Sequence, residues 1–153
     1  MLRTLRRRLW QALDVDIFLD KTPSADDLRP LFDDGRGISI IGAWEESGSM
    51  SSGDHQVVIA MNESEFPVGV EFQRRPTGDE EWLLEAARHL SVALRCRSIY
   101  SGSPLGDATP WDVIVFDRGR AFMGDNCGTK VANEGDKPVS LGDRLPALDA
   151  IFV

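Results

Sequence analysis

The sequence is poor in the residues that most often carry chemistry or cross-link a fold. Its 153 residues include two cysteines, Cys96 and Cys127, and two histidines, His55 and His89. Two cysteines do not make the disulfide framework of a small secreted protein, so we expect reduced thiols and a cytoplasmic location. His55 has no cysteine or second histidine at ligand spacing, which argues against zinc. We therefore predict no catalytic residues, no metal and no other cofactor, in a protein that is not an enzyme.

Long apolar runs and nucleotide-binding motifs are also missing. No apolar run approaches the roughly 20 residues that a transmembrane helix needs, so we expect no membrane partner. The sequence contains no Walker loop, no G-x-G-x-x-G and no G-x-S-x-G. Their absence argues against the common classes of nucleotide-binding protein and of serine hydrolase.

The charge of the chain is acidic and unevenly placed. The formal net charge is −8, but residues 1–13 contain four arginines and no acid, so the rest of the chain carries −12. A body this acidic repels nucleic acid and attracts a basic partner. The alternative is that the acidic charge serves only to keep the protein soluble.

The first fourteen residues have the pattern of an amphipathic helix. Leu2, Leu5, Leu9 and Leu13 fall on one helical stripe, and arginines fill the other face. We expect this segment, residues 1–14, to pack on the domain through its leucines. A mitochondrial presequence and a membrane-surface helix are the alternatives for such a pattern.

Three runs in the first half of the chain predict strands. The segments GISIIGAW, HQVVIAM and FPVGVEFQR are rich in β-branched and apolar residues. The loop EESGSMSSGD and the short NESE separate them, which is the spacing of an antiparallel meander. A short helix precedes them, because Ser24 and Asp27 have the spacing of an N-terminal cap and Pro30 would break a helix interior.

The clearest helix covers about residues 78–95. Thr77 and Glu80 form its predicted capping box, and an apolar stripe runs along it at Leu83, Ala86, Ala87, Leu90 and Leu94. Three further strands follow, CRSIY and the two strands of a hairpin, and residues 124–153 form a loop-rich segment whose apolar end we expect to reach the core. The elements predict an α+β fold in a single domain, residues 1–153. Its sheet is mostly antiparallel, with a long central helix and the N-terminal helix packed on it.

The stretch Trp111–Gly128, WDVIVFDRGRAFMGDNCG, combines three aspartates and a cysteine with several glycines. A calcium loop needs a run such as D-x-D-x-D-G and a distal glutamate, which GDNCG does not supply. Asp117, Arg118 and Gly119 lie where a hairpin must turn, and Gly119 can supply a positive φ. We therefore interpret the stretch as a β-hairpin and not as an acidic active site.

One pair of side chains keeps a small enzyme open as an alternative. His89 and Cys96 lie seven residues apart near the end of the predicted helix, so a Cys–His nucleophile pair is sterically conceivable. No third residue that would orient the pair is apparent. A buried thiol beside a histidine on the helix surface is the commoner arrangement.

Acids and an aromatic residue gather on two connections between the predicted strands. One loop carries Trp44, Glu45, Glu46 and Asp54, and the next adds Glu63 and Glu65. Loops carry binding more often than cores do, so we predict that these residues bind a protein partner. In a meander the two loops lie at opposite ends of the middle strand, and each would then contribute to a wide interface. Solvated polar loops without a partner are the alternative.

The segment LSVALRCRSIYSGSPLGDATPWDVIVFDRGRAFM resembles immunity proteins of bacterial polymorphic-toxin systems. In many of these a helix ends in an L-x-x-x-L-x-C/V run, and a short strand, a polar loop, an aromatic-led strand and a D-x-G hairpin follow. The resemblance implies a small cytosolic protein that binds and neutralises one secreted toxin without catalysis. The order helix, three strands, helix, strands also resembles type III secretion chaperones, which bind an effector.

Overall fold

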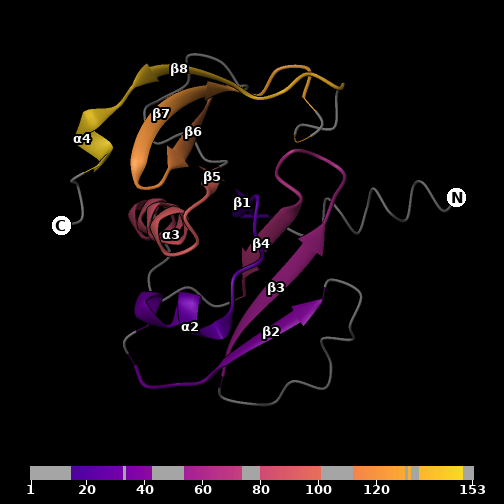
Figure 1. Ribbon diagram of the computed structural model, residues 1–153. Helices are drawn as coiled ribbons and strands as arrows, with labels where there is room; N and C mark the ends of the chain where they lie inside the picture. Colours follow the sequence, from indigo (N-terminus) through magenta and orange to yellow (C-terminus); the bar gives the residue numbers. More distant parts are fainter. Residues whose placement is uncertain are drawn as a thin grey trace, which may run out of the picture.

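The computed structural model describes residues 15–32, 34–42, 54–73, 80–100, 112–129, 131 and 135–149. Its strands form one sheet in the order β2-β3-β4-β1-β5-β6-β7-β8 (Figure 1). Their bounds are β1 Ile17–Leu19, β2 Ile38–Gly42, β3 His55–Met61, β4 Val68–Phe72, β5 Arg97–Tyr100, β6 Asp112–Asp117, β7 Arg120–Asp125 and β8 Ser140–Arg144. The helices are α2 Ala25–Leu28, the 3-10 helix η1 Arg29–Leu31, α3 Glu80–Ala93 and α4 Pro146–Asp149.

The α+β class and the mostly antiparallel sheet are confirmed, whereas the long central helix is not. Helix α3 has 14 residues, an ordinary length, and α2 and α4 have four each. The predicted N-terminal helix lies outside the described residues. Ser24 and Asp27 do form a capping box at α2, and Pro30 falls in η1, where the α-helix gives way to a 3-10 turn.

Strands β2 and β3 are the exception to antiparallel pairing. Ile38 lies opposite His55 and Gly42 opposite Ile59, so the two strands run in parallel and the predicted meander is wrong at this step. Residues 43–54 connect them, and about a dozen residues are enough for the crossover that a parallel pair requires. The next connection is much shorter, and β3 and β4 pair in the antiparallel sense, as predicted.

Each face of the sheet carries its own hydrophobic cluster. Helix α3 packs on β1, β5 and β6 and buries Leu83, Ala86, Ala87 and Leu90 there, while Leu94 is partly buried at the margin (Figure 1). The opposite face holds a second cluster formed by Phe18, Phe66, Ile99, Val113, Val115, Val131 and Val139. The sheet is therefore covered on both sides, by helices on one and by residues that follow β7 on the other.

The C-terminal segment contains more regular structure than the sequence predicts. Strand β8 pairs with β7 through Leu141 opposite Gly124, and α4 follows, with Leu148 buried in the helix-side cluster. Gly124 permits a close approach here, because a Cβ at that position would lie 2.8 Å from Val115 Cγ2 and 3.5 Å from Val139 Cγ1. The segment after β7 can thus cross the sheet at van der Waals distance.

Candidate functional site

The aspartate-rich stretch is a hairpin, as predicted. Strands β6 and β7 pair from Asp112 opposite Asp125 to Asp117 opposite Arg120, which leaves a two-residue turn. Both turn residues have positive φ, 50° at Arg118 and 88° at Gly119, as a type I′ turn requires. The described residues contain no group of three or more His, Cys, Asp or Glu side chains that could hold a metal ion.

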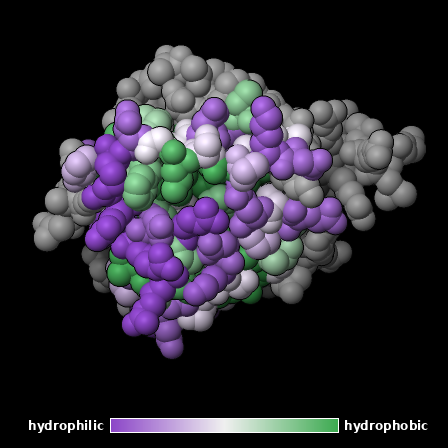
Figure 2. Space-filling model, turned by 45° about the horizontal axis from the view of Figure 1, so that its top comes forward, coloured by the Kyte–Doolittle hydropathy of each residue, from purple (hydrophilic) through white to green (hydrophobic). Residues whose placement is uncertain are grey.

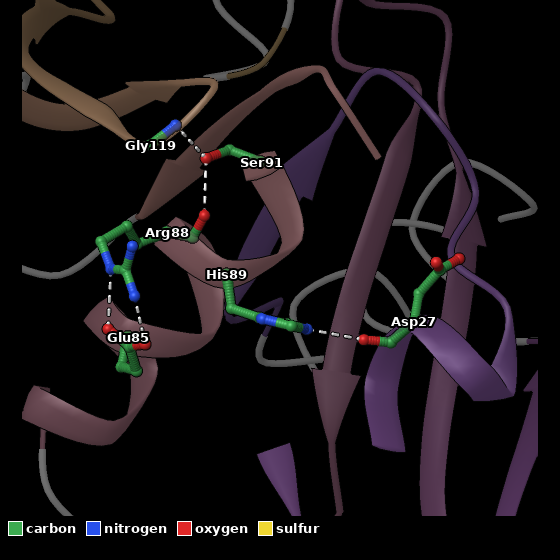
Figure 3. Close-up of polar contacts among 6 residues, drawn as sticks. All are labelled: Asp27, Glu85, Arg88, His89, Ser91 and Gly119. Carbon is green, nitrogen blue, oxygen red and sulfur yellow. Dashed lines mark hydrogen bonds and ion pairs between the residues drawn. The ribbon is translucent and has the colours of Figure 1, made fainter. Parts of the chain in front are cut away.

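His89 and Cys96 are engaged in separate parts of the fold. His89 Nε2 lies 2.8 Å from the carbonyl oxygen of Asp27 and ties α3 to α2 (Figure 3). Cys96 is buried, and burial, together with the charge of Asp20, raises the pKa of its thiol to about 12. A thiol with such a pKa is protonated at neutral pH, so it lacks the thiolate that a nucleophile needs.

The same helix is tied to the β6–β7 turn by a buried serine. Ser91 Oγ donates to the Arg88 carbonyl oxygen at 2.6 Å and accepts the Gly119 N–H at 2.9 Å (Figure 3). On the same helix, the partly buried Arg88 forms a two-pronged ion pair with Glu85. These contacts fix the position of the hairpin turn against α3.

His55, at the start of β3, belongs to a cluster that sequence reasoning missed. Its Nε2 lies 2.8 Å and 2.9 Å from the two oxygens of Asp34, and its ring stacks on Phe32 with centroids 4.1 Å apart. The hydrogen bond with His55 lowers the pKa of the Asp34 carboxylate. Phe32 also contacts Phe72 and Trp82, so the cluster joins η1, β3, β4 and α3. No spacing in the sequence indicated this pairing across 21 residues.

Three of the six predicted partner-binding residues lie within the described part of the chain. Trp44, Glu45 and Glu46 lie outside it. Asp54 precedes β3 and accepts a hydrogen bond from Ser39 Oγ at 3.0 Å. At the other end of β3, Glu65 accepts the Val139 N–H. Glu63, beside it, is exposed.

The turn that carries Glu63 is held by its own hydrogen bonds. Asn62 Nδ2 donates to the Phe66 carbonyl oxygen at 2.9 Å, Asn62 Oδ1 accepts the Ser64 N–H at 2.7 Å, and Ser64 Oγ accepts the Phe66 N–H at 3.1 Å. The Asn62 N–H closes the turn on the Pro67 carbonyl oxygen at 2.8 Å. Met61, the last residue of β3, is 63% exposed. We call residues 61–67 the Met61–Pro67 turn.

A polar cavity of about 520 Å³ opens where β1 ends, β5 begins and the β6–β7 turn lies. We call it the basic cavity, because four of its lining side chains are cationic and two are carboxylates. It is lined by Asp20, Lys21, Arg95, Cys96, Arg97, Asp117 and Arg118. No sequence motif indicated it, since its residues come from three separate segments.

Comparison with protein-family models, with curated proteins and with solved structures found no match for this chain. Among the described residues, no helix is both long enough and apolar enough to cross a membrane.

Proposed function

We propose that the protein is an immunity protein, a non-catalytic inhibitor that binds and neutralises a cognate toxin in the cytoplasm. The observation that carries this proposal is the Met61–Pro67 turn. It presents an exposed apolar side chain, Met61, next to an exposed carboxylate, Glu63, on a backbone held by its own hydrogen bonds.

Such a turn has the properties of a prearranged contact site. A loop that is already ordered loses little conformational entropy on binding, so more of the contact energy appears as affinity. The Met61 side chain is flexible and polarizable, and methionine is common on protein-binding surfaces. Glu63 has no hydrogen bond or ion pair with any described residue, which leaves its carboxylate available to a partner.

The charge of the protein favours a basic toxin. The net charge is −8, and complementary charge mainly accelerates the encounter of two proteins. Figure 2 shows a face on which hydrophilic side chains predominate and apolar ones form small separate groups. A partner that approached such a face would meet mostly polar and charged groups, which suits recognition guided by charge.

The groups best suited to catalysis are used within the fold, which supports a binding function. The His89 ring is hydrogen-bonded to the carbonyl oxygen of Asp27, and the His55 ring to the carboxylate of Asp34. The Cys96 thiol is protonated at neutral pH. Both Cys96 and Cys127 are free, as expected of a protein that acts in the reducing cytoplasm.

The proposal is tested by co-expression with the C-terminal domain of any large secreted protein whose gene lies next to the gene for this chain. An immunity protein restores growth of cells that make the toxic domain, and the purified pair forms a complex. Met61→Ala should weaken that complex about tenfold or more, as expected of a hot-spot side chain. Glu63→Lys should slow association, and added salt should shrink the difference.

Matched controls lie on the helices that cover the face of the sheet opposite Phe66. Val92→Ala removes an apolar side chain of α3 that is 47% exposed, and Asp26→Lys reverses an exposed acid of α2. Both should leave affinity and association rate unchanged. The loop with Trp44 remains part of the proposed interface, and joint reversal of Glu45, Glu46 and Asp54 tests it. Failure to restore growth would contradict the proposal, and a neighbouring effector kept soluble without any toxicity to block would favour a secretion chaperone.

A further inference from the structure

We propose that the basic cavity binds the phosphate group of a small phosphorylated molecule. The site lies at one end of the sheet, where three segments meet. Asp20 and Lys21 follow β1, Arg95 and Cys96 connect α3 to β5, and the β6–β7 turn supplies Arg118. This inference concerns a small-molecule site and does not depend on the proposed toxin.

Hydrogen bonds hold the three segments together. The Arg118 N–H donates to the Cys96 carbonyl oxygen at 3.2 Å, and Lys21 Nζ donates to the Leu94 carbonyl oxygen at 3.1 Å. The hydrogen bond from the Gly119 N–H to Ser91 Oγ also ties the β6–β7 turn to α3. The cationic side chains therefore project from a backbone that is already arranged.

The charge of the cavity is opposite to that of the protein. Arg118 Nη1 pairs with Asp117 at 3.1 Å, and Arg97 Nε lies 3.7 Å from Asp20. Among the described residues, Lys21 hydrogen-bonds only to a carbonyl oxygen, and the Arg95 guanidinium has no ion pair or hydrogen bond. A surplus of two positive charges remains in a protein of net charge −8. A phosphate monoester carries between −1.5 and −2 at pH 7, which matches that surplus.

Two of the cations occupy strained backbone positions. Arg95 and Arg118 are the non-glycine residues with positive φ in the described part of the chain, and φ is 50° at each. Glycine or asparagine adopts this conformation at lower cost than arginine. Strained residues gather at functional sites, and here both line the same cavity. Positive φ is usual at both places, the type I′ turn and the C-terminal end of α3, but the chain has arginine there in place of glycine or asparagine.

The cavity is larger than a phosphate ion needs. The volume of about 520 Å³ exceeds that of a phosphate ion and falls in the range of small-molecule pockets. A small phosphorylated molecule such as a sugar phosphate fits both the volume and the surplus charge of the cavity.

The test is calorimetric titration of the whole protein with inorganic phosphate, ribose 5-phosphate and succinate in low-salt buffer. We expect saturable binding of one equivalent of phosphate, tighter binding of ribose 5-phosphate and weaker binding of succinate. Arg95→Asn and Arg118→Asn should each lower the affinity for ribose 5-phosphate about tenfold. Asparagine tolerates positive φ, so both variants should melt at or above the temperature of the wild type.

Arg120→Gln is the matched control, because Arg120 is exposed on the same hairpin and does not line the cavity. It should leave the affinity unchanged. Arg95→Lys keeps the charge but loses the two-pronged donor, so it should restore part of the affinity lost in Arg95→Asn. The proposal would be overturned by the absence of saturable phosphate binding, by tighter binding of succinate, or by an equal loss in the Arg120→Gln control.

Discussion

Replacing Leu90 by alanine tests the packing of α3 on the sheet. Leu90 is fully buried in the helix-side cluster, at 0% exposure, whereas Val92 on the same helix is 47% exposed. Truncating a fully buried leucine removes its transfer free energy and leaves a cavity, which together cost about 2–5 kcal/mol. Val92→Ala removes surface that is half in water, and we expect a cost of less than about 0.5 kcal/mol.

These costs are large enough to measure. Domains of this size lose about 2–4 °C of melting temperature per kcal/mol, so Leu90→Ala should melt about 4–20 °C lower than the wild type. Urea unfolding followed by circular dichroism should show a lower midpoint with an unchanged slope. Equal midpoints for Leu90→Ala and Val92→Ala would refute the packing of this helix face. A changed slope would mean that the variant alters the compactness of the unfolded or native state, or that its unfolding is no longer two-state.

Three further predictions follow from contacts elsewhere in the fold. Ser91→Ala should destabilise the protein by about 1–3 kcal/mol in urea unfolding, because it leaves the Gly119 N–H without its acceptor; a neutral result would contradict this role. Iodoacetamide at pH 8 should label the exposed Cys127 and spare Cys96, whose pKa is about 12, until the protein unfolds, as read by mass spectrometry. The pKa of Asp34 is lowered by folding, so its carboxylate stabilises the fold above about pH 4 and this contribution is lost as the pH falls further. The difference in urea midpoint between wild type and Asp34→Asn should therefore shrink from pH 6 to pH 3, and a constant difference would contradict it.

Local signals in the sequence predicted much of the secondary structure. The capping box at Ser24, the apolar stripe that contains Leu90 and the turn at Gly119 each involve residues close in the sequence, so spacing alone reveals them. The parallel pairing of β2 and β3 was missed, because a loop of about a dozen residues allows either direction. Strand β8 was missed because all five of its residues are exposed, which removes the alternation that marks a half-buried strand.

The candidate sites were harder to predict because they join distant segments. The pair formed by His55 and Asp34 and the basic cavity depend on tertiary contacts that no spacing encodes. Arg95 and Arg118 look like ordinary surface arginines in the sequence. Their significance lies in the sign of φ, which only the folded backbone reveals. The predicted site at Glu63 and Glu65 could be recognised as a polar loop. The sequence does not reveal that Glu65 accepts the N–H of Val139, which lies 74 residues further along the chain.

The two proposed sites share one end of the sheet, and the register of β1 explains why. Leu19 lies opposite Val68 on one side and Ser98 on the other. The Met61–Pro67 turn therefore lies beside the residues that line the basic cavity. Arg97 joins them directly, because its guanidinium lies 4.9 Å from the centroid of the Phe66 ring. A phosphate would offset the surplus positive charge of this neighbouring cavity, so an occupied cavity should repel a basic partner less than an empty one. By linkage, the partner would raise the affinity for the phosphorylated molecule by the same factor.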